Sequence, residues 1–291
     1  NILYFELAHH GNSWDDTPSM PEIHPTAILD GNISLAGDVE IGPHCVLKGD
    51  IQLGAGTKLV GNCYLTGSLS MGEQNTVYPF TSIGFAAQDI SCPADKYEPG
   101  IVIGDRNVFR EGFTAHRATK ETPTTIGDDN LFMASSHVAH DCNIGNQNTI
   151  VNCVLLAGHV HIQNNILIGG DAAVHQFVTI GNGAMIIGMG YASYDLLPYF
   201  MITGPNIVGS INIIGMRRSG MPNDEIRRRK DIYKLLYKSG NTIITSVKQL
   251  KEEGDPVAME YVHLIETSRR GIIAPFHTTR SERRGVVIAH E

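Results

Sequence analysis

Aliphatic residues recur at every sixth position along most of this chain. The pattern runs from Ile23 to Ile83, resumes at Ile103, and then continues from Ile126 to Ala192. A helix of 3.6 residues per turn would spread residues six apart around its circumference, and one long strand would not need turns at regular intervals. Gly or Pro is frequent two positions after the aliphatic residue. A period of six therefore indicates a short strand, a turn and another short strand.

Repeats of this kind build a parallel β-helix in which each flat side is one hexad. The pattern resembles the left-handed β-helix of hexapeptide-repeat acyltransferases, whose triangular coil takes three hexads, or about 18 residues. The fifth position of each hexad is also small or apolar, so we predict an interior filled by two columns of side chains. Cys45, Cys63 and Cys142 fall on that position and are expected to be buried packing residues.

The hexads stop near residue 200, and a different pattern follows. We predict a helix that begins with Asn223 as N-cap and ends at Gly240, and further helices over 242–253 and 257–269. The predicted domains are a β-helix over 20–204 and an α-helical domain over 205–291. Residues 1–19 are expected to be an irregular extension outside the fold.

Composition and charge narrow the function. Charged residues make up 18% of the chain, and Lys plus Arg number 22 against 30 Asp plus Glu, giving a net charge of −8. This excludes a protein whose whole surface binds nucleic acid. No apolar run is long enough to span a membrane. The odd number of cysteines argues against a disulfide framework and favours a reducing, cytoplasmic setting.

A chemical patch follows from the stacking of coils. Residues 18 apart should lie one above the other, so His140 stacks with Gly158 and Gln176. Counting hexads across the interruptions at 89–102 and 121–125 places His116 beneath Ala139. The sequence therefore predicts one patch composed of His116, His137, His140, Asp141, His159, His175 and Gln176.

This patch has the residue types for proton transfer. A histidine near its ordinary pKa of about 6.5 can accept a proton at neutral pH. Asp141 can orient it, and the N–H of Gly158 can face a developing oxyanion because glycine has no side chain to shield it. The alternative is an ordinary solvated face, but 13 histidines spread at random would not gather five on adjacent coils.

Several short stretches carry a specific resemblance. The strings SSHVAHDC (135–142), LLAGHV (155–160) and AVHQF (173–177) resemble the acyl-carrier-protein-dependent UDP-N-acetylglucosamine O-acyltransferases, which begin lipid A synthesis. The resemblance covers residues 21–275. It implies a homotrimer with active sites between subunits, no cofactor and no metal.

The resemblance also implies roles for individual residues. His140 would be the general base that deprotonates the sugar 3-hydroxyl for attack on the acyl thioester, Asp141 would support it, and the Gly158 N–H would form the oxyanion hole. The remaining implied contacts, to sugar, phosphate, nucleotide and acyl chain, are Asp89, His116, His137, His159, His175, Gln176, Gly188 and Arg218.

The chain departs from the family pattern near Asp89. Ser91 stands where the family places a lysine, and Lys96 is the expected replacement. In the late basic motif, Ser219 replaces a second arginine and Ile214 replaces a glutamate. We therefore expect the nucleotide contacts to differ from those of the family.

A run of basic residues lies in the predicted helical domain. Arg227, Arg228, Arg229 and Lys230 follow one another in a chain that is acidic overall. One interpretation is a solvated helix face. The other is a dock for an acidic acyl carrier protein, which complementary charge would attract.

Three other interpretations remain open. The first is a trimeric β-helix zinc enzyme of the γ-carbonic-anhydrase type, which is also rich in histidine. The second is a related hexapeptide acyltransferase that uses another sugar nucleotide or transfers the acyl chain to nitrogen. The third is a non-catalytic scaffold, which would need no base. We expect acyl transfer by single displacement, because no exposed serine or cysteine is predicted beside His140.

Overall fold

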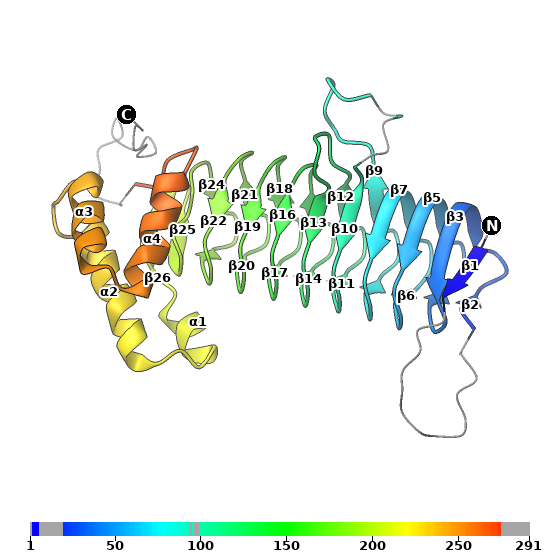
Figure 1. The fold of residues 1–291 in the computed structure, drawn as a ribbon, viewed down its shortest axis with the longest axis horizontal. Coiled ribbons are helices and arrows are strands. Elements are labelled where there is room, and N and C mark those ends of the chain that lie inside the picture. Colours follow the sequence, from blue (N-terminus) through cyan, green and yellow to red (C-terminus); the bar gives the residue numbers. More distant parts are fainter. Residues whose placement is uncertain (1, 6–19, 94, 96–98, 275–291) are drawn as a thin grey trace. The chain divides into compact units, whose positions relative to one another are not determined.

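Two compact units make up the chain in a computed structural model: residues 1–147 and residues 148–291. The structure describes residues 2–5, 20–93, 95 and 99–274. In both units, short strands stack side by side in parallel, as the successive arrows of Figure 1 show. The predicted fold class, a parallel β-helix of hexapeptide repeats followed by an α-helical part, is confirmed.

The amino-terminal unit contains strands β1 to β16. Their bounds are β1 Ile2–Phe5, β2 Glu22–Ile23, β3 Ile28–Ala36, β4 Glu40–Ile41, β5 Val46–Leu53, β6 Lys58–Leu59, β7 Tyr64–Met71, β8 Thr76–Val77, β9 Ser82–Phe85, β10 Ile101–Ile103, β11 Val108–Phe109, β12 Thr114–His116, β13 Thr124–Ile126, β14 Leu131–Phe132, β15 His137–Val138 and β16 Asn143–Ile144. Neighbouring strands follow the orders β2-β4-β6-β8-β11-β14 and β16-β13-β10-β7-β9-β12-β15, and β3 and β5 extend the second sheet from β7.

The long strands β3, β5 and β7 each bend around a corner at a glycine. Gly49 has φ of 110°, a conformation that L side chains rarely adopt. A Cβ at this position would lie 2.7 Å from the carbonyl oxygen of Gly67 on the next strand. Glycine at the corner therefore lets neighbouring strands pack at the ordinary spacing of a β-sheet.

The carboxyl-terminal unit continues the same pattern. Its strands are β17 Thr149–Ile150, β18 Leu155–Leu156, β19 His161–Ile162, β20 Leu167–Ile168, β21 Ala173–Val174, β22 Thr179–Ile180, β23 Met185–Ile186, β24 Tyr191–Ala192, β25 Phe200–Gly204 and β26 Ile207–Ile211. Within this unit the neighbours are β19-β22, β18-β21-β24 and β17-β20-β23-β25-β26. The hairpin β25–β26 is antiparallel and closes the series, a feature that the hexad pattern did not predict.

The hexad residues form the core, as predicted. Ile23 and Leu29, at the start of the series, are half-buried, and every later aliphatic hexad residue is at most 2% exposed. Cys45, Cys63 and Cys142 are buried as well, which confirms them as interior residues. The five cysteines, all of them among the described residues, form no disulfide bond, and Cys153 is exposed.

Three phenylalanines fill the interior beneath β12. The ring centroids of Phe109 and Phe132 are 5.3 Å apart, and Phe113 lies 4.9 Å from each of them. All three side chains are fully buried. Phe113 immediately precedes Thr114, the first residue of β12, so this cluster supports the strand that carries candidate site residues.

Four helices follow the strands: α1 Ile213–Arg218, α2 Asn223–Tyr237, α3 Ile243–Glu253 and α4 Pro256–Thr267. The predicted helices correspond to α2, α3 and α4, whereas α1 was not predicted. Asn223 is not the N-cap of α2, because it is already helical and Pro222 precedes it as the cap. Gly240 is not the C-cap either, since the helix ends at Tyr237. It nevertheless adopts a left-handed conformation three residues later.

The predicted extension over residues 1–19 contains one described element. Ile2–Phe5 form β1, which pairs in parallel register with Ile33–Ala36 of β3. Residues 6–19 lie outside the described residues. The domain boundary between residues 204 and 205 stays a prediction. Among the described residues, no helix combines the length and apolar content needed to cross a bilayer.

Candidate active site

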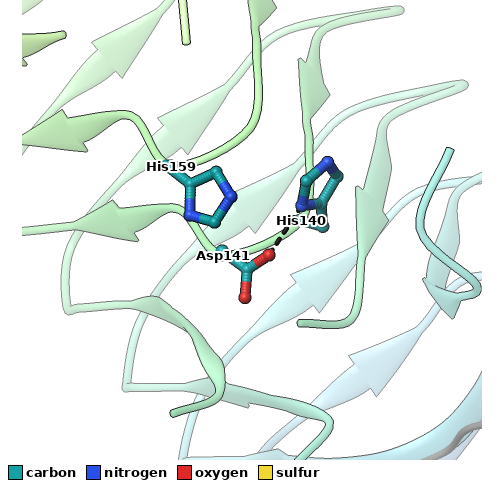
Figure 2. Close-up of side chains that lie close together, drawn as sticks. All are labelled: His140, Asp141 and His159. Carbon is teal, nitrogen blue, oxygen red and sulfur yellow. Dashed lines mark hydrogen bonds and ion pairs between the residues drawn. The ribbon is translucent and has the colours of Figure 1, made fainter. Parts of the chain in front are cut away.

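His140 and Asp141 form a hydrogen-bonded pair at a corner of the amino-terminal unit. The distance from Nδ1 of His140 to Oδ2 of Asp141 is 2.6 Å (Figure 2). The Asp141 side chain is 5% exposed and the His140 side chain 14% exposed, so solvent screens the pair little. Asp141 has φ of 59°, the left-handed conformation that recurs at corners of this fold.

The Asp141 carboxylate is held from the segment that follows β12. The Thr119 hydroxyl donates to Oδ2 at 2.6 Å, and the backbone N–H groups of Thr119 and Lys120 both donate to Oδ1 at 3.0 Å. Burial alone would raise the pKa of Asp141. The hydrogen bonds from Thr119, His140 and the Lys120 backbone outweigh burial and hold this pKa below its usual value.

An ionised carboxylate can only accept hydrogen bonds, so its partner on His140 must be Nδ1–H. The neutral imidazole then carries its lone pair on Nε2. This is the form in which a histidine can remove a proton from a substrate hydroxyl. The geometry within the amino-terminal unit thus suits His140 to act as a base.

His116 and His137 lie together beside this pair. Their ring centroids are 4.9 Å apart in an edge-to-face arrangement. Nδ1 of His137 is 2.7 Å from the hydroxyl of Thr114, while Nδ1 of His116 is buried without a hydrogen-bond partner among the described residues. The register of β12 on β15, with Ala115 opposite Val138, confirms that the hexad count across the second interruption was correct.

Burial and neighbouring charge keep these two histidines neutral. Burial, followed by the charges of His137, His140 and Arg117, lowers the pKa of His116 to about 4. Burial and His140 also lower the pKa of His137. A neutral imidazole offers one hydrogen-bond donor and one acceptor, which suits these two histidines to polar contacts without adding charge to the site.

The low pKa of His116 predicts a loss of stability in weak acid. The unfolded state binds a proton below about pH 6.5, whereas the folded state resists protonation down to about pH 4. Stability is therefore fully present above pH 6.5 and is lost as the pH falls toward 4. At pH 5 this one group should cost about 2 kcal/mol of unfolding free energy relative to pH 8.

Urea unfolding at pH 8 and pH 5 checks this prediction. The His116→Gln variant should lose about 2 kcal/mol less than the wild type between the two pH values. His263→Gln, which changes an exposed histidine, is the matched control and should lose as much as the wild type. Equal losses in wild type and His116→Gln would contradict the prediction.

Asp89 and Arg117 lie near the histidines of the amino-terminal unit. The Asp89 carboxylate accepts hydrogen bonds from the backbone N–H and hydroxyl of Ser91, which lower its pKa, and His140 and Lys120 lower it further by their charge. Arg117 is 3% exposed and donates to the carbonyl oxygen of Gly84 at 2.8 Å. Lys96, the predicted replacement for the family's lysine, lies outside the described residues.

In the carboxyl-terminal unit, neighbouring corners carry the predicted residues Gly158, His159, His175 and Gln176. The rings of His159 and Phe177 stack with centroids 4.5 Å apart, which confirms that residues 18 apart lie above each other. The Phe177 N–H donates a hydrogen bond to the Gly158 carbonyl oxygen at 3.2 Å. Gln176 directly precedes Phe177, so it lies next to the corner that carries Gly158. His175 and Gln176 are exposed, and Gly158 is buried.

Gly188 and Arg218 lie elsewhere in the carboxyl-terminal unit. Gly188 is exposed, and a Cβ there would meet its nearest neighbour, the Gly170 carbonyl oxygen, at an ordinary 3.4 Å. The backbone at this position therefore does not require glycine. What glycine provides here is open space, because it has no side chain. Arg218 is exposed in the last turn of α1.

The basic run is only partly available to a partner. Arg228 pairs with Glu253 and Asp255, and Arg229 is 6% exposed and pairs with Glu225 and Glu260. These two arginines join the helices by ion pairs, and the buried Arg229 cannot be part of a docking surface. The arginines of this region that are exposed are Arg217, Arg218, Arg227 and Arg269, and Lys230 of the basic run is half-buried.

Thr119 is the functional candidate that the sequence did not identify. Its hydroxyl reaches Asp141 across 22 positions of the chain, a distance that the hexad period does not encode because the interruption at 121–125 intervenes. The available signal was the hydroxyl residue at the end of the string HRAT (116–119), which lies two positions before the interruption at 121–125 and close in sequence to His116.

Comparison with known proteins identifies several UDP-N-acetylglucosamine O-acyltransferases as relatives of this chain. A family model described as "Udp N-acetylglucosamine O-acyltransferase; Domain 2" matches residues 195–273. The acyl-[acyl-carrier-protein]–UDP-N-acetylglucosamine O-acyltransferase of Pseudomonas savastanoi pv. phaseolicola is 45% identical over 260 residues, which cover 87% of this chain and 100% of the relative.

Solved structures agree with the sequence relatives. The UDP-N-acetylglucosamine O-acyltransferase of Moraxella catarrhalis matches with a TM-score of 0.82 at 35% identity, covering 86% of this chain and 99% of that protein. The Francisella novicida UDP-N-acetylglucosamine acyltransferase matches with a TM-score of 0.79 at 31% identity, covering 94% and 99%. Since relatives of this name match along their whole length, the chain belongs to the family of acyl-[acyl-carrier-protein]–UDP-N-acetylglucosamine O-acyltransferases, which are transferases.

Proposed function

We propose that this protein transfers a 3-hydroxyacyl chain from acyl carrier protein to the 3-hydroxyl of UDP-N-acetylglucosamine, the first step of lipid A synthesis. The observation that carries the proposal is the His140–Asp141 pair, whose geometry fits a general base, in a chain whose relatives are named for this reaction. The names of the relatives favour this reaction over the rival interpretations, a zinc carbonic anhydrase and a transferase for another acceptor.

The proposed reaction is a single displacement. Nε2 of His140 takes the proton of the sugar 3-hydroxyl while the hydroxyl oxygen attacks the carbonyl carbon of the thioester. The carbonyl oxygen becomes an oxyanion that the Gly158 N–H stabilises. The intermediate collapses, the C–S bond breaks, and the proton on His140 passes to the departing thiolate. The products are the 3-O-acyl sugar nucleotide and the free carrier-protein thiol.

The side chains near His140 support a mechanism without a covalent intermediate. Cys142 is 1% exposed and belongs to the core, and the buried Ser136 donates its hydroxyl to the Met133 carbonyl oxygen. Neither is available as a nucleophile for an acyl-enzyme. Pre-steady-state kinetics should therefore show no burst of carrier protein release.

The 18-residue repeat of the sequence is what supports placing Gly158, His159, His175 and Gln176 on the same patch as His140. In this proposal Asp89, His116 and His137 bind the sugar, Arg218 the nucleotide, and Gly188 lines the end of the acyl groove. A homotrimer would complete the site between subunits.

We further propose that the exposed cations around α1 and α2 receive the carrier protein. Arg217, Arg218 and Arg227 are exposed, while the chain as a whole carries a net charge of −8. Such a cationic surface would attract an acidic protein and be screened by salt. The KM for acyl carrier protein should therefore rise with ionic strength, whereas that for an uncharged thioester fragment should not.

A turnover assay tests the proposed function. Purified protein is incubated with a panel of 3-hydroxyacyl carrier proteins of different chain length and either UDP-N-acetylglucosamine or its 3-amino analogue. Formation of the 3-O-acyl sugar nucleotide supports the proposal and reveals the preferred chain length. Absence of any acylated product, or near-stoichiometric zinc in the purified protein, would count against it.

A further inference from the structure

We propose that Thr119 is a positioning residue for acyl transfer, which together with the Lys120 backbone clamps the Asp141 carboxylate and so fixes the orientation of His140. This inference rests on the proposed function, because it concerns the base of that reaction. Thr119 and Lys120 belong to the segment between β12 and β13, in the same unit as His140.

The clamp engages both oxygens of the carboxylate. Oδ1 accepts two backbone N–H groups, from Thr119 and Lys120, and Oδ2 accepts the Thr119 hydroxyl. Two donors on one oxygen and a third on the other define the plane of the carboxylate, so rotation about its Cβ–Cγ bond would break hydrogen bonds. Hydrogen bonds to an ionised acceptor are the strong ones, particularly where the side chain is 5% exposed.

The orientation of Asp141 is transmitted to His140 through Oδ2. This oxygen lies 2.6 Å from the Thr119 hydroxyl oxygen and 2.6 Å from Nδ1 of His140. With Oδ2 fixed, Nδ1–H has one direction in which to donate, and the imidazole plane is set. Nε2 then keeps its lone pair on the opposite side of the ring, as a base requires.

The local sequence explains how this clamp arises. The coil that joins Thr114 to His137 spans 23 residues instead of the usual 18, because five residues are inserted after Lys120. At the far end of the insertion, the Thr124 hydroxyl accepts the Asp141 N–H at 2.9 Å. Both ends of the insertion thus contact Asp141, which ties the added segment to the base instead of leaving it as an unrelated loop.

The Thr119→Val variant tests the proposal, because it removes the hydroxyl and keeps the side-chain shape. We expect kcat to fall about tenfold with little change in KM for the sugar nucleotide. We also expect NMR of ring-¹⁵N histidine, with His140 assigned from His140→Ala, to show a mixture of tautomers where the wild type shows Nδ1–H. Thr119→Ser, which restores the hydroxyl, should recover both properties.

Thr125→Val is the matched control. The Thr125 hydroxyl oxygen is buried five positions from Lys120 and has no hydrogen-bond partner among the described residues. The same substitution there should leave kcat and the His140 tautomer unchanged. Should valine at position 119 disturb folding, Thr119→Ala removes the same hydroxyl with less steric demand and gives the same readouts.

Two outcomes would overturn the proposal. One is a Thr119→Val variant with the kcat and the His140 tautomer of the wild type. The other is an equal loss of kcat in Thr119→Val and Thr119→Ser, with the wild-type tautomer in both. The proposed function is tested separately by His140→Ala. If that variant keeps its activity, the base assignment fails. If it is inactive while Thr119→Val is normal, only the role of Thr119 fails.

Discussion

Replacing His140 by alanine should lower kcat for acyl transfer by about a thousandfold. In the proposed mechanism the imidazole removes the proton of the attacking hydroxyl only as the transition state forms, and a positioned base of this kind contributes about 10²- to 10⁴-fold. Because this interaction is made in the transition state, KM for UDP-N-acetylglucosamine should change little. Steady-state assays with a saturating 3-hydroxyacyl carrier protein measure both parameters.

The matched control for this prediction is His263→Ala. His263 is an exposed histidine on α4 and takes no part in the proposed chemistry, so its loss should leave kcat within twofold, about the scatter of such assays. Asp141→Asn should fall between the two variants, because it keeps the base but removes the acceptor that fixes its tautomer. Wild-type kcat in His140→Ala would show that another group deprotonates the hydroxyl.

Replacing Phe132 by alanine should lower the unfolding free energy by about 3 to 5 kcal/mol. The ring is fully buried, stacks on Phe109 at a centroid distance of 5.3 Å and contacts Phe113 at 4.9 Å. Alanine leaves a cavity that the neighbouring rungs cannot close, because their strands are fixed by hydrogen bonds on both sides. Urea unfolding at one protein concentration measures the loss.

Phe80→Ala is the corresponding surface control. Phe80 belongs to the same unit but is 71% exposed, so the same substitution should change the unfolding free energy by no more than about 0.5 kcal/mol. A loss below 1 kcal/mol in Phe132→Ala would mean that the interior repacks around the cavity, and the close-packed core described above would then be wrong.

The fold was predictable because the six-residue period of the sequence determines almost every strand of the β-helix. An aliphatic residue every six positions specifies which side chains enter the core, and Ile33, Leu35 and their successors are buried as the period requires. The hairpin β25–β26 and helix α1 were missed because they belong to no repeat. The N-cap of α2 was misplaced because Asn223 is a good capping residue that lies one position inside the helix.

The candidate site was predictable only where it follows the repeat. The stacking of His159 on Phe177 and the register that brings His116 toward His137 both derive from counted hexads. The hydrogen bonds from Thr119 do not, since they come from residues outside the period. The pairing of Arg229 with Glu225 and Glu260 was also missed, because a run of basic letters does not reveal which side chains face inward.

The longer coil between Thr114 and His137 has a consequence for how such enzymes can diversify. The five extra residues leave the pairing of β12 with β15 and of β10 with β13 in register, so the scaffold is indifferent to the length of this corner. Natural variation or protein engineering can therefore lengthen, shorten or exchange the segment as a cassette. Such changes would tune the proposed base through Asp141 while the strands that place His140 remain unchanged.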